Sequence, residues 1–299
     1  MSPLPQDIVD VILDAVAYTS DSDEFPAIPR ADIVSCSLVC RKWLARSSYH
    51  LLRRLHFEVP GYEPIAEDGE KVTERVMRLL KASRTSCRLM SYINGLSIEW
   101  SVGMPPLVTL IDEIKRSLPR LSVLRMYHGP ISGINPFPVP LRNNQYNIKT
   151  LDIGMYDPAS EDPVQRWLFE FLRLFSRIEH LRLVCLDEID KDKIIQKSPH
   201  LHVHHVELQQ TDFDVLQALR MVAIPSSVAI LTINHLGSWT PDRGHIHALD
   251  KFVEACSESL TEFSFESASA PTKPRTDSEW LLRSLATSQS LKFSQDPLD

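Results

Sequence analysis

Four histidines stand close together in the second half of the chain, and a metal ion is the ligand that such a cluster first suggests. They are His200, His202, His204 and His205. Alternate residues of a strand share a face, so His202 and His204 could both reach one ion. A metal site would need further ligands, and the chain has no HExxH motif. The spacing therefore favours a strand-entry or surface role, and we expect no metal and no cofactor.

The cysteines do not suggest a metal centre or a disulfide framework. The chain has five cysteines, an odd number without paired short spacings. Cys36 and Cys40 are four residues apart on one face of an expected helix, but no further ligands lie nearby. A buried apolar pair is the favoured interpretation. Unpaired cysteines indicate a reducing compartment, so we expect the cytoplasm, the nucleus or both.

Catalytic motifs are missing from the sequence. There is no GxSxG, no GxGxxG and no GxxxxGK[ST], and glycine is scarce, with 9 residues against 21 prolines. The carboxylates are scattered, so no catalytic pair stands out. We therefore expect that the chain is not an enzyme. A hydrolase or transferase remains an alternative that a deep pocket with convergent titratable groups would support.

Composition and charge restrict the partners. The chain has 299 residues, of which 43% are hydrophobic and 24% are charged, and its formal net charge is −7. This charge argues against generic attraction to nucleic acid or to an anionic membrane. No window approaches 18 consecutive apolar residues, and the first residues lack the basic and apolar regions of a secretory signal. We expect a soluble intracellular protein.

The amino-terminal residues have a helical pattern. Apolar residues at spacings of three and four predict a helix over 4–18, and the acidic and proline-containing stretch 19–30 predicts a solvated connection. A second helix is predicted over about 31–47, with a break near Cys36. A third element is predicted over 50–57.

Three short segments in this region resemble the F-box family. They are Leu4-Pro5-x-Asp7, Ile8-x-x-x-Ile12-Leu13 and Leu38-Val39-Cys40-Arg41-Lys42-Trp43. The resemblance covers about residues 1–57 and implies a three-helix module that binds a Skp-type adaptor, which is linked to a cullin–RING ubiquitin ligase. The long insert 19–30 departs from the family pattern. The residues expected to contact the adaptor are Leu4, Pro5, Ile8, Val9, Ile12, Leu38, Val39 and Trp43.

A module of this size buries only a marginal core, and part of its apolar surface remains exposed unless another element packs on it. That element is either a partner or the rest of the chain. The alternative is that these apolar side chains merely pack against one another.

Beyond residue 60 a short apolar-x-apolar unit recurs. Its copies start at Leu96, Leu124, Leu151, Leu181, Val206, Leu231, Phe263 and Leu291. The intervals are 28, 27, 30, 25, 25, 32 and 28 residues. Helix-like segments are predicted over 71–92, 107–118, 164–175, 188–197, 213–222, 248–256 and 278–285. Strands that alternate with helices at this period predict a solenoid with a parallel sheet.

This region resembles the degenerate leucine-rich repeats of fungal F-box proteins. The expected fold class is α/β, with an F-box-like helical domain over 1–57, a linker over 58–70 and a leucine-rich-repeat-like domain over 71–299. A non-repetitive α/β domain is the alternative. A doubly wound fold would require longer apolar strands and glycine-rich turns.

The middle residue of each unit is expected to face solvent on the sheet. These residues are Ser97, Arg125, Asp152, Arg182, Glu207, Thr232, Ser264 and Lys292, and one step outward are Glu99, Tyr127, Gly154, Gln209, Asn234 and Glu266. Mixed charges favour recognition of a protein over a phosphate polymer. The substrate-binding residues predicted on this face are Arg125, Tyr127, Asp152, Arg182, Glu207, Gln209 and Asn234. A hydrophilic, merely solvated face is the alternative.

The two resemblances together imply a substrate-recognition adaptor of a Skp–cullin–F-box ubiquitin ligase. Its partners would be a Skp-type adaptor, the cullin ligase and a protein substrate that the sequence does not identify, with no nucleic acid and no membrane. The alternative is a ligase-independent interaction scaffold with a repurposed F-box.

Overall fold

The computed structural model shows an α/β chain that forms two compact units. The first comprises Met1–Pro105 and Thr109–Tyr127, and the second comprises Pro106–Val108 and His128–Asp299. The structure describes residues 5–17, 31–57, 66–83, 90–100, 107–128, 146–155, 168, 171–186, 199–211, 214–235, 243–267 and 292–294. The helices predicted over 188–197 and 278–285 lie outside these residues, as does Leu4. None of the described helices combines the length and the apolar character that crossing a bilayer would require.

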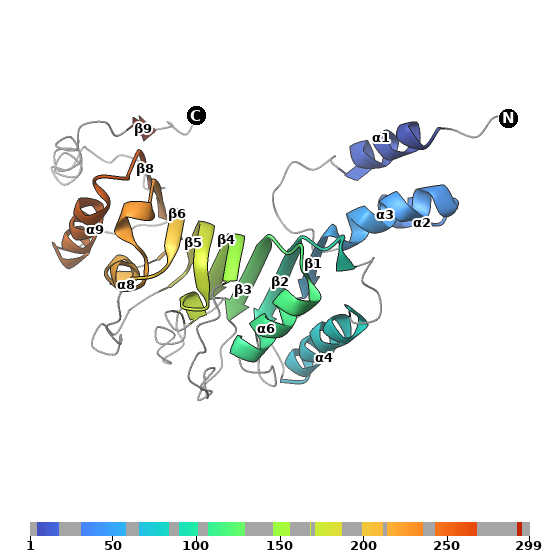
Figure 1. Ribbon diagram of the computed structural model, residues 1–299, viewed down its shortest axis with the longest axis horizontal. Helices are drawn as coiled ribbons and strands as arrows, with labels where there is room; N and C mark the ends of the chain where they lie inside the picture. Colours follow the sequence, from blue (N-terminus) through green and yellow to red (C-terminus); the bar gives the residue numbers. More distant parts are fainter. Residues whose placement is uncertain are drawn as a thin grey trace. The chain divides into compact units, whose positions relative to one another are not determined.

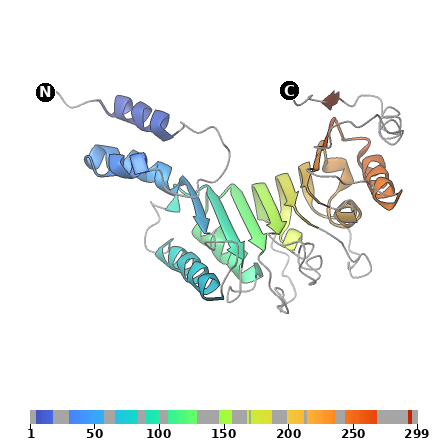
Figure 2. The same ribbon diagram turned by 180° about the vertical axis from the view of Figure 1, so that it is seen from behind.

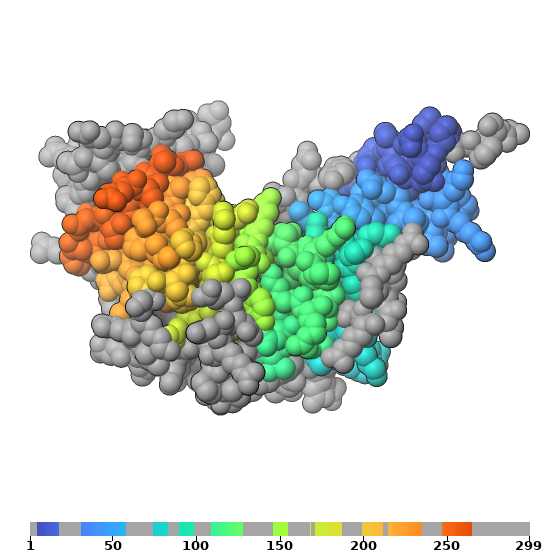
Figure 3. Space-filling view, in the orientation of Figure 1, coloured from blue at the N-terminus to red at the C-terminus, as the bar shows by residue number. Residues whose placement is uncertain are grey.

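The first unit begins with three helices: α1 (Gln6–Ala17), α2 (Ala31–Ser37) and α3 (Arg41–Arg53). Val9 and Leu13 of α1 are one helical turn apart, and both are buried together with Ile33 of α2. Helix α1 lies along α2 and α3, as the dark and lighter blue atoms of Figure 3 show. The predicted first helix is confirmed, and the predicted break in the second falls at 38–40.

The structure does not contain the separate third element that was predicted over 50–57. Helix α3 continues through Arg53, and the chain then passes directly into strand β1 (Arg54–Phe57). The rest of the first unit contains α4 (Ala66–Ser83), β2 (Gly95–Trp100), α6 (Leu107–Ser117) and β3 (Val123–His128). Strand β1 pairs with β2 in parallel, and Leu55 lies opposite Leu96.

The second unit contains β4 (Tyr146–Met155), β5 (Phe175–Val184), β6 (His202–Gln209), β7 (Ile230–His235), β8 (Glu262–Ser267) and β9 (Lys292–Ser294). These strands lie in chain order, and every neighbouring pair is parallel (Figure 1). The register aligns the apolar residues that start the predicted units, in the row Leu151, Leu181, Val206, Leu231 and Phe263. The predicted strand positions are therefore confirmed here. The last copy is shifted, because Phe293 and not Leu291 lies opposite Phe263.

Helices α8 (Asp214–Val222) and α9 (Arg243–Cys256) follow β6 and β7 and pack side by side (Figure 2). Parallel crossovers have one preferred hand, so successive crossovers in one direction leave their helices on the same face of the sheet. The apolar row of the strands is buried, as are Leu216 and Leu219 of α8. The helix predicted over 164–175 ends earlier, because Phe175 already begins β5. A short 3-10 helix, η2 (Pro225–Ser227), follows α8.

The chain turns in the same way after β5 and after β6. Cys185 and Gln210 occupy equivalent positions and have φ angles of 52° and 50°. The N–H of Cys185 donates to Gln209 at 2.9 Å, and that of Gln210 donates to Asn234 at 3.0 Å. Left-handed backbone is costly for residues other than glycine, so the hydrogen bonds to the next strand help to hold these turns. The repeat thus extends beyond the strands into their connections.

Candidate functional site

Among the described residues, the exposed large apolar side chains gather on the first three helices and in the turn between α2 and α3. We call them the apolar helix surface; they are Ile8, Val11, Ile12, Val34, Leu38, Val39 and Leu44. Leu38 is 82% exposed and Val11 is 67% exposed. Among the described residues, only Met77 of α4 belongs to the same class and lies elsewhere. Scattered apolar residues on a surface are ordinary, whereas such a concentration makes this region a candidate binding site.

The sequence of α1 explains why this surface remains uncovered. An amphipathic helix has one apolar stripe, and α1 buries its stripe through Val9 and Leu13. The helix also has Ile8, Val11 and Ile12 outside that stripe, and these three side chains are exposed. A helix with apolar residues on more than one side is typical of a buried element. Helix α1 therefore has more apolar surface than the described part of its own unit covers.

A polar contact fixes α1 on α3. Arg46 donates two hydrogen bonds to Asp14, from Nε to Oδ1 at 2.7 Å and from Nη2 to Oδ2 at 2.6 Å. Nε2 of His50 lies 2.8 Å from Oδ1 of the same carboxylate. The hydrogen bonds from Arg46, together with the one to His50, lower the pKa of Asp14. Burial lowers the pKa of His50, although the hydrogen bond to Asp14 acts in the opposite direction. These contacts fix the position of α1 on α3, and so also the positions of the exposed apolar side chains of α1.

The predicted adaptor-contact residues fall into different environments. Pro5, Ile8, Ile12, Leu38 and Val39 are exposed, and Trp43 is half-buried. Val9 is 1% exposed and packs in the helical core, so it is unable to contact a partner directly. Helical phase explains the difference, because Val9 shares a side of α1 with Leu13. Val11, Val34 and Leu44 were not among the predicted residues, but they are exposed as well.

Polar side chains form a second feature, on β4–β7. We call Asp152, Arg182, Glu207, Gln209 and Asn234 the polar ladder. Arg182 lies between two carboxylates, with Nη1 3.6 Å from Asp152 and Nε 3.2 Å from Glu207, and it also donates to Gln209. Asn234 donates to Glu207 at 3.4 Å. The register of the strands brings these residues together, as the alignment of the units predicted.

The expectation that every middle residue faces solvent is wrong for Ser97 and Asp152, each of which is 1% exposed. Neighbouring side chains on the strands cover these small residues, and the alternation of a strand fixes direction but not depth. Arg182, Glu207, Gln209 and Asn234 are half-buried. Arg125 and Tyr127, which are also half-buried, belong to the first unit.

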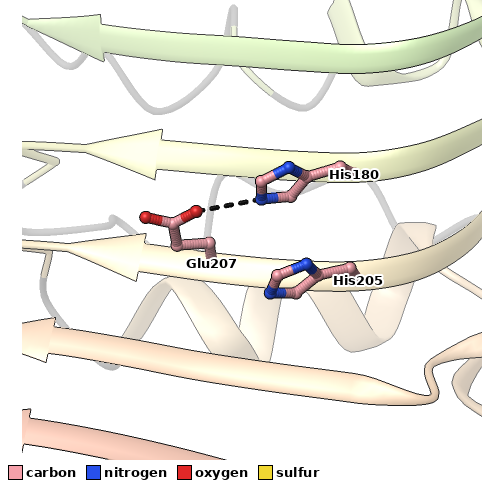
Figure 4. A group of neighbouring side chains, drawn as sticks. All are labelled: His180, His205 and Glu207. Carbon is pink, nitrogen blue, oxygen red and sulfur yellow. Dashed lines mark hydrogen bonds and ion pairs between the residues drawn. The ribbon is translucent and has the colours of Figure 1, made fainter. Parts of the chain in front are cut away.

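A histidine–glutamate trio lies at one end of the polar ladder and consists of His180, His205 and Glu207 (Figure 4). Nε2 of His180 lies 2.9 Å from Oε2 of Glu207. The two imidazole rings stack with centroids 4.2 Å apart and planes 5° apart. His202 and His204, which the sequence suggested as a pair, are exposed and do not belong to the trio.

The local electrostatics determine the charges of the trio. Burial, with a smaller contribution from the nearby His180, lowers the pKa of His205 from 6.5 to about 4, so the His205 ring is neutral at neutral pH. Burial raises the pKa of Glu207, but the hydrogen bond to His180 and the charge of Arg182 outweigh burial, so that the pKa lies below its ordinary value. The trio therefore combines a neutral imidazole with an ionised carboxylate.

The trio could have been found from the sequence by aligning the repeated units. His180 directly precedes Leu181, and His205 directly precedes Val206, so aligned units place the two histidines on neighbouring strands. Spacing within one strand gave no such signal.

Comparisons with known proteins add no family to this picture. No protein-family model, no curated protein and no solved structure matches the chain. Its function therefore has to be inferred from the residues and their geometry.

Proposed function

We propose that this chain is the substrate-recognition subunit of a Skp–cullin–F-box ubiquitin ligase. In this proposal a Skp-type adaptor covers the apolar helix surface, and a protein substrate binds the polar face of the repeated strands. One observation carries the proposal: seven of the eight exposed large apolar side chains of the described residues lie on α1–α3 or in the turn between α2 and α3, where the F-box-like segments lie.

The energetics of burial support a stable complex at this surface. Burying a leucine or isoleucine side chain completely contributes about 1.5–3 kcal/mol. Leu38 and Val39 begin from 82% and 60% exposure, so most of that contribution is still available to a partner. Ile8, Val11 and Leu44 add to it. Several such side chains can offset the loss of translational and rotational freedom on association, which costs about 4–15 kcal/mol.

The second unit supports the other half of the proposal. Parallel strands in chain order, with α8 and α9 on one face, leave the opposite face free of these helices. Half-buried charged and amide groups there can hydrogen-bond a protein surface. Other subunits would catalyse ubiquitin transfer, and this chain would contribute proximity and orientation.

Copurification of the full chain with a recombinant Skp-type adaptor tests the proposal. The wild-type chain is expected to retain the adaptor, and a chain with Ile8→Asp and Leu38→Asp is expected to lose it, because two carboxylates would have to be desolvated at the contact. Met77→Asp is the matched control, since it introduces the same charge at an exposed apolar position of α4. This control should retain the adaptor.

Two results would contradict the proposal. One is a wild-type chain that does not retain the adaptor, and the other is undiminished retention by the double variant. Circular dichroism of both variants should match the wild type, because the substituted side chains are exposed. Retention of the adaptor without cullin in a cell extract would instead support a ligase-independent scaffold.

A further inference from the structure

The histidine–glutamate trio has the composition of a transition-metal site. We propose that His180, His205 and Glu207 together bind one divalent ion of the zinc class on the sheet of the second unit. This inference does not rest on the ubiquitin-ligase proposal, because the three ligands lie on β5 and β6 and none belongs to the apolar helix surface. The alternative is that the three side chains form only a hydrogen-bonded and stacked cluster.

The ligand atoms are already close enough for a common ion. One ligand atom from each residue lies within 4.8 Å of the others, and the His180–Glu207 pair is separated by 2.9 Å. Ligands about 2.0–2.2 Å from a tetrahedral zinc ion lie about 3.3 Å from one another. The two rings would also have to turn out of their parallel stack, because the lone pair of an imidazole nitrogen lies in the plane of its ring. The parallel rings extend from adjacent strands beside Glu207, as Figure 4 shows.

Neighbouring groups orient two of the three ligands. Arg182 and Asn234 both approach Oε1 of Glu207, at 3.2 and 3.4 Å, which leaves Oε2 directed at His180. Nε2 of His205 lies 3.0 Å from Oγ1 of Thr232. If this nitrogen donates its proton to Thr232, Nδ1 is available to the ion. A partner of this kind on the second ring nitrogen is the usual feature of a metal-binding histidine.

The chemistry of the donors selects the class of ion. Imidazole nitrogens favour zinc, copper or nickel, whereas calcium and magnesium prefer oxygen ligands throughout. The positive charge of Arg182 beside Glu207 is offset by Asp152, 3.6 Å from the guanidinium. Three protein ligands leave a fourth position, which water or a side chain of a bound protein can occupy.

Titration of the full-length, EDTA-treated chain with Co²⁺ and with Zn²⁺ tests this site. Co²⁺ is expected to produce the visible absorption of a tetrahedral complex at one ion per chain, and Zn²⁺ is expected to displace it. Glu207→Gln keeps the shape of the side chain and removes the charge, and we expect it to weaken binding by about 10-fold or more. His205→Gln is expected to abolish the absorption.

His202→Ala and His204→Ala are the matched controls, because these exposed histidines lie on the same strand outside the trio. Both should bind Co²⁺ as the wild type does. The proposal is overturned if the wild-type chain gives no tetrahedral absorption, or if the controls lose it while His205→Gln retains it. Circular dichroism of each metal-free variant checks its fold. If His205→Gln is unfolded, the wild-type titration and Glu207→Gln decide the question.

Discussion

Replacing Arg182 with methionine removes the cation at the centre of the polar ladder. The guanidinium lies between Asp152, whose side chain is 1% exposed, and Glu207, whose side chain is 15% exposed. Methionine retains most of the packing of the arginine stem, so the substitution mainly removes charge and hydrogen bonds. Two carboxylates would then remain in a largely buried environment without this shared cation.

The expected loss of stability from Arg182→Met lies between two limits. Removing one partner of a fully buried ion pair costs about 3–5 kcal/mol, whereas an exposed pair contributes about 0.2–1 kcal/mol. The Arg182 side chain is 29% exposed, so solvent screens part of the interaction. We expect Arg182→Met to lower the free energy of unfolding by about 2–3 kcal/mol.

Urea denaturation followed by circular dichroism measures this loss. Arg177→Met is the control, because Arg177 is an exposed arginine of the same strand, and it should change stability by less than about 0.5 kcal/mol. A double-mutant cycle with Asp152→Asn should give a coupling energy of about 1–2 kcal/mol. A loss from Arg182→Met no larger than that of the control, with additive effects in the cycle, would refute the ladder as a source of stability.

Three further predictions concern the helical core and the titrating groups. Leu13→Ala should lower the free energy of unfolding by about 2–5 kcal/mol, whereas Leu38→Ala should change it by less than about 0.5 kcal/mol, in thermal denaturation. His205 should titrate near pH 4 in an NMR experiment, well below the ordinary value of 6.5. As the pH falls, His205 is protonated in the unfolded chain before it is protonated in the folded chain. The contribution of the neutral His205 to stability is therefore fully present above pH 6.5 and is lost progressively toward pH 4. After allowance for solvent screening the loss should be about 1–2 kcal/mol, and His205→Asn should remove it. Asp14→Asn should lower the free energy of unfolding by about 1 kcal/mol, because it weakens the contact of α1 with α3. In the wild type, this contribution should be present above pH 3.8 and should be lost as the pH falls through the lower pKa that Asp14 has in the folded chain.

Each of these predictions has a contrary result. Equal losses from Leu13→Ala and Leu38→Ala would mean that the helices pack differently. A His205 resonance that titrates near 6.5 would contradict the burial of its ring. Unchanged stability of Asp14→Asn at neutral pH would show that the contact with Arg46 does not hold α1 in place.

The repeated strands could be predicted because each unit maps directly onto one strand. Leu151, Leu181, Val206 and Leu231 each start an apolar-x-apolar unit, and the parallel register places all four in one row. Strand β1 was missed although Leu55 and Phe57 alternate with polar residues. Four residues that directly follow a long helix give a weak signal, and here pairing with β2 determines the strand.

The candidate sites could be predicted less completely, for a different reason. The motif resemblance placed Ile8 and Leu38 among the exposed contact residues, but it placed the buried Val9 there too, and only the helical phase of α1 separates Val9 from Ile8. The burial of Asp152 depends on the side chains of neighbouring strands. The contact between His180 and His205 spans two strands, so only the pairing of whole units reveals it.

Hydrogen–deuterium exchange of the full chain, with and without a saturating Skp-type adaptor, tests most directly whether the apolar helix surface is a docking surface. We expect slower exchange in α1 and in α2–α3, with exchange in β5–β7 unchanged. Unaltered exchange in these helices, or protection confined to the strands, would contradict a docking role for this surface.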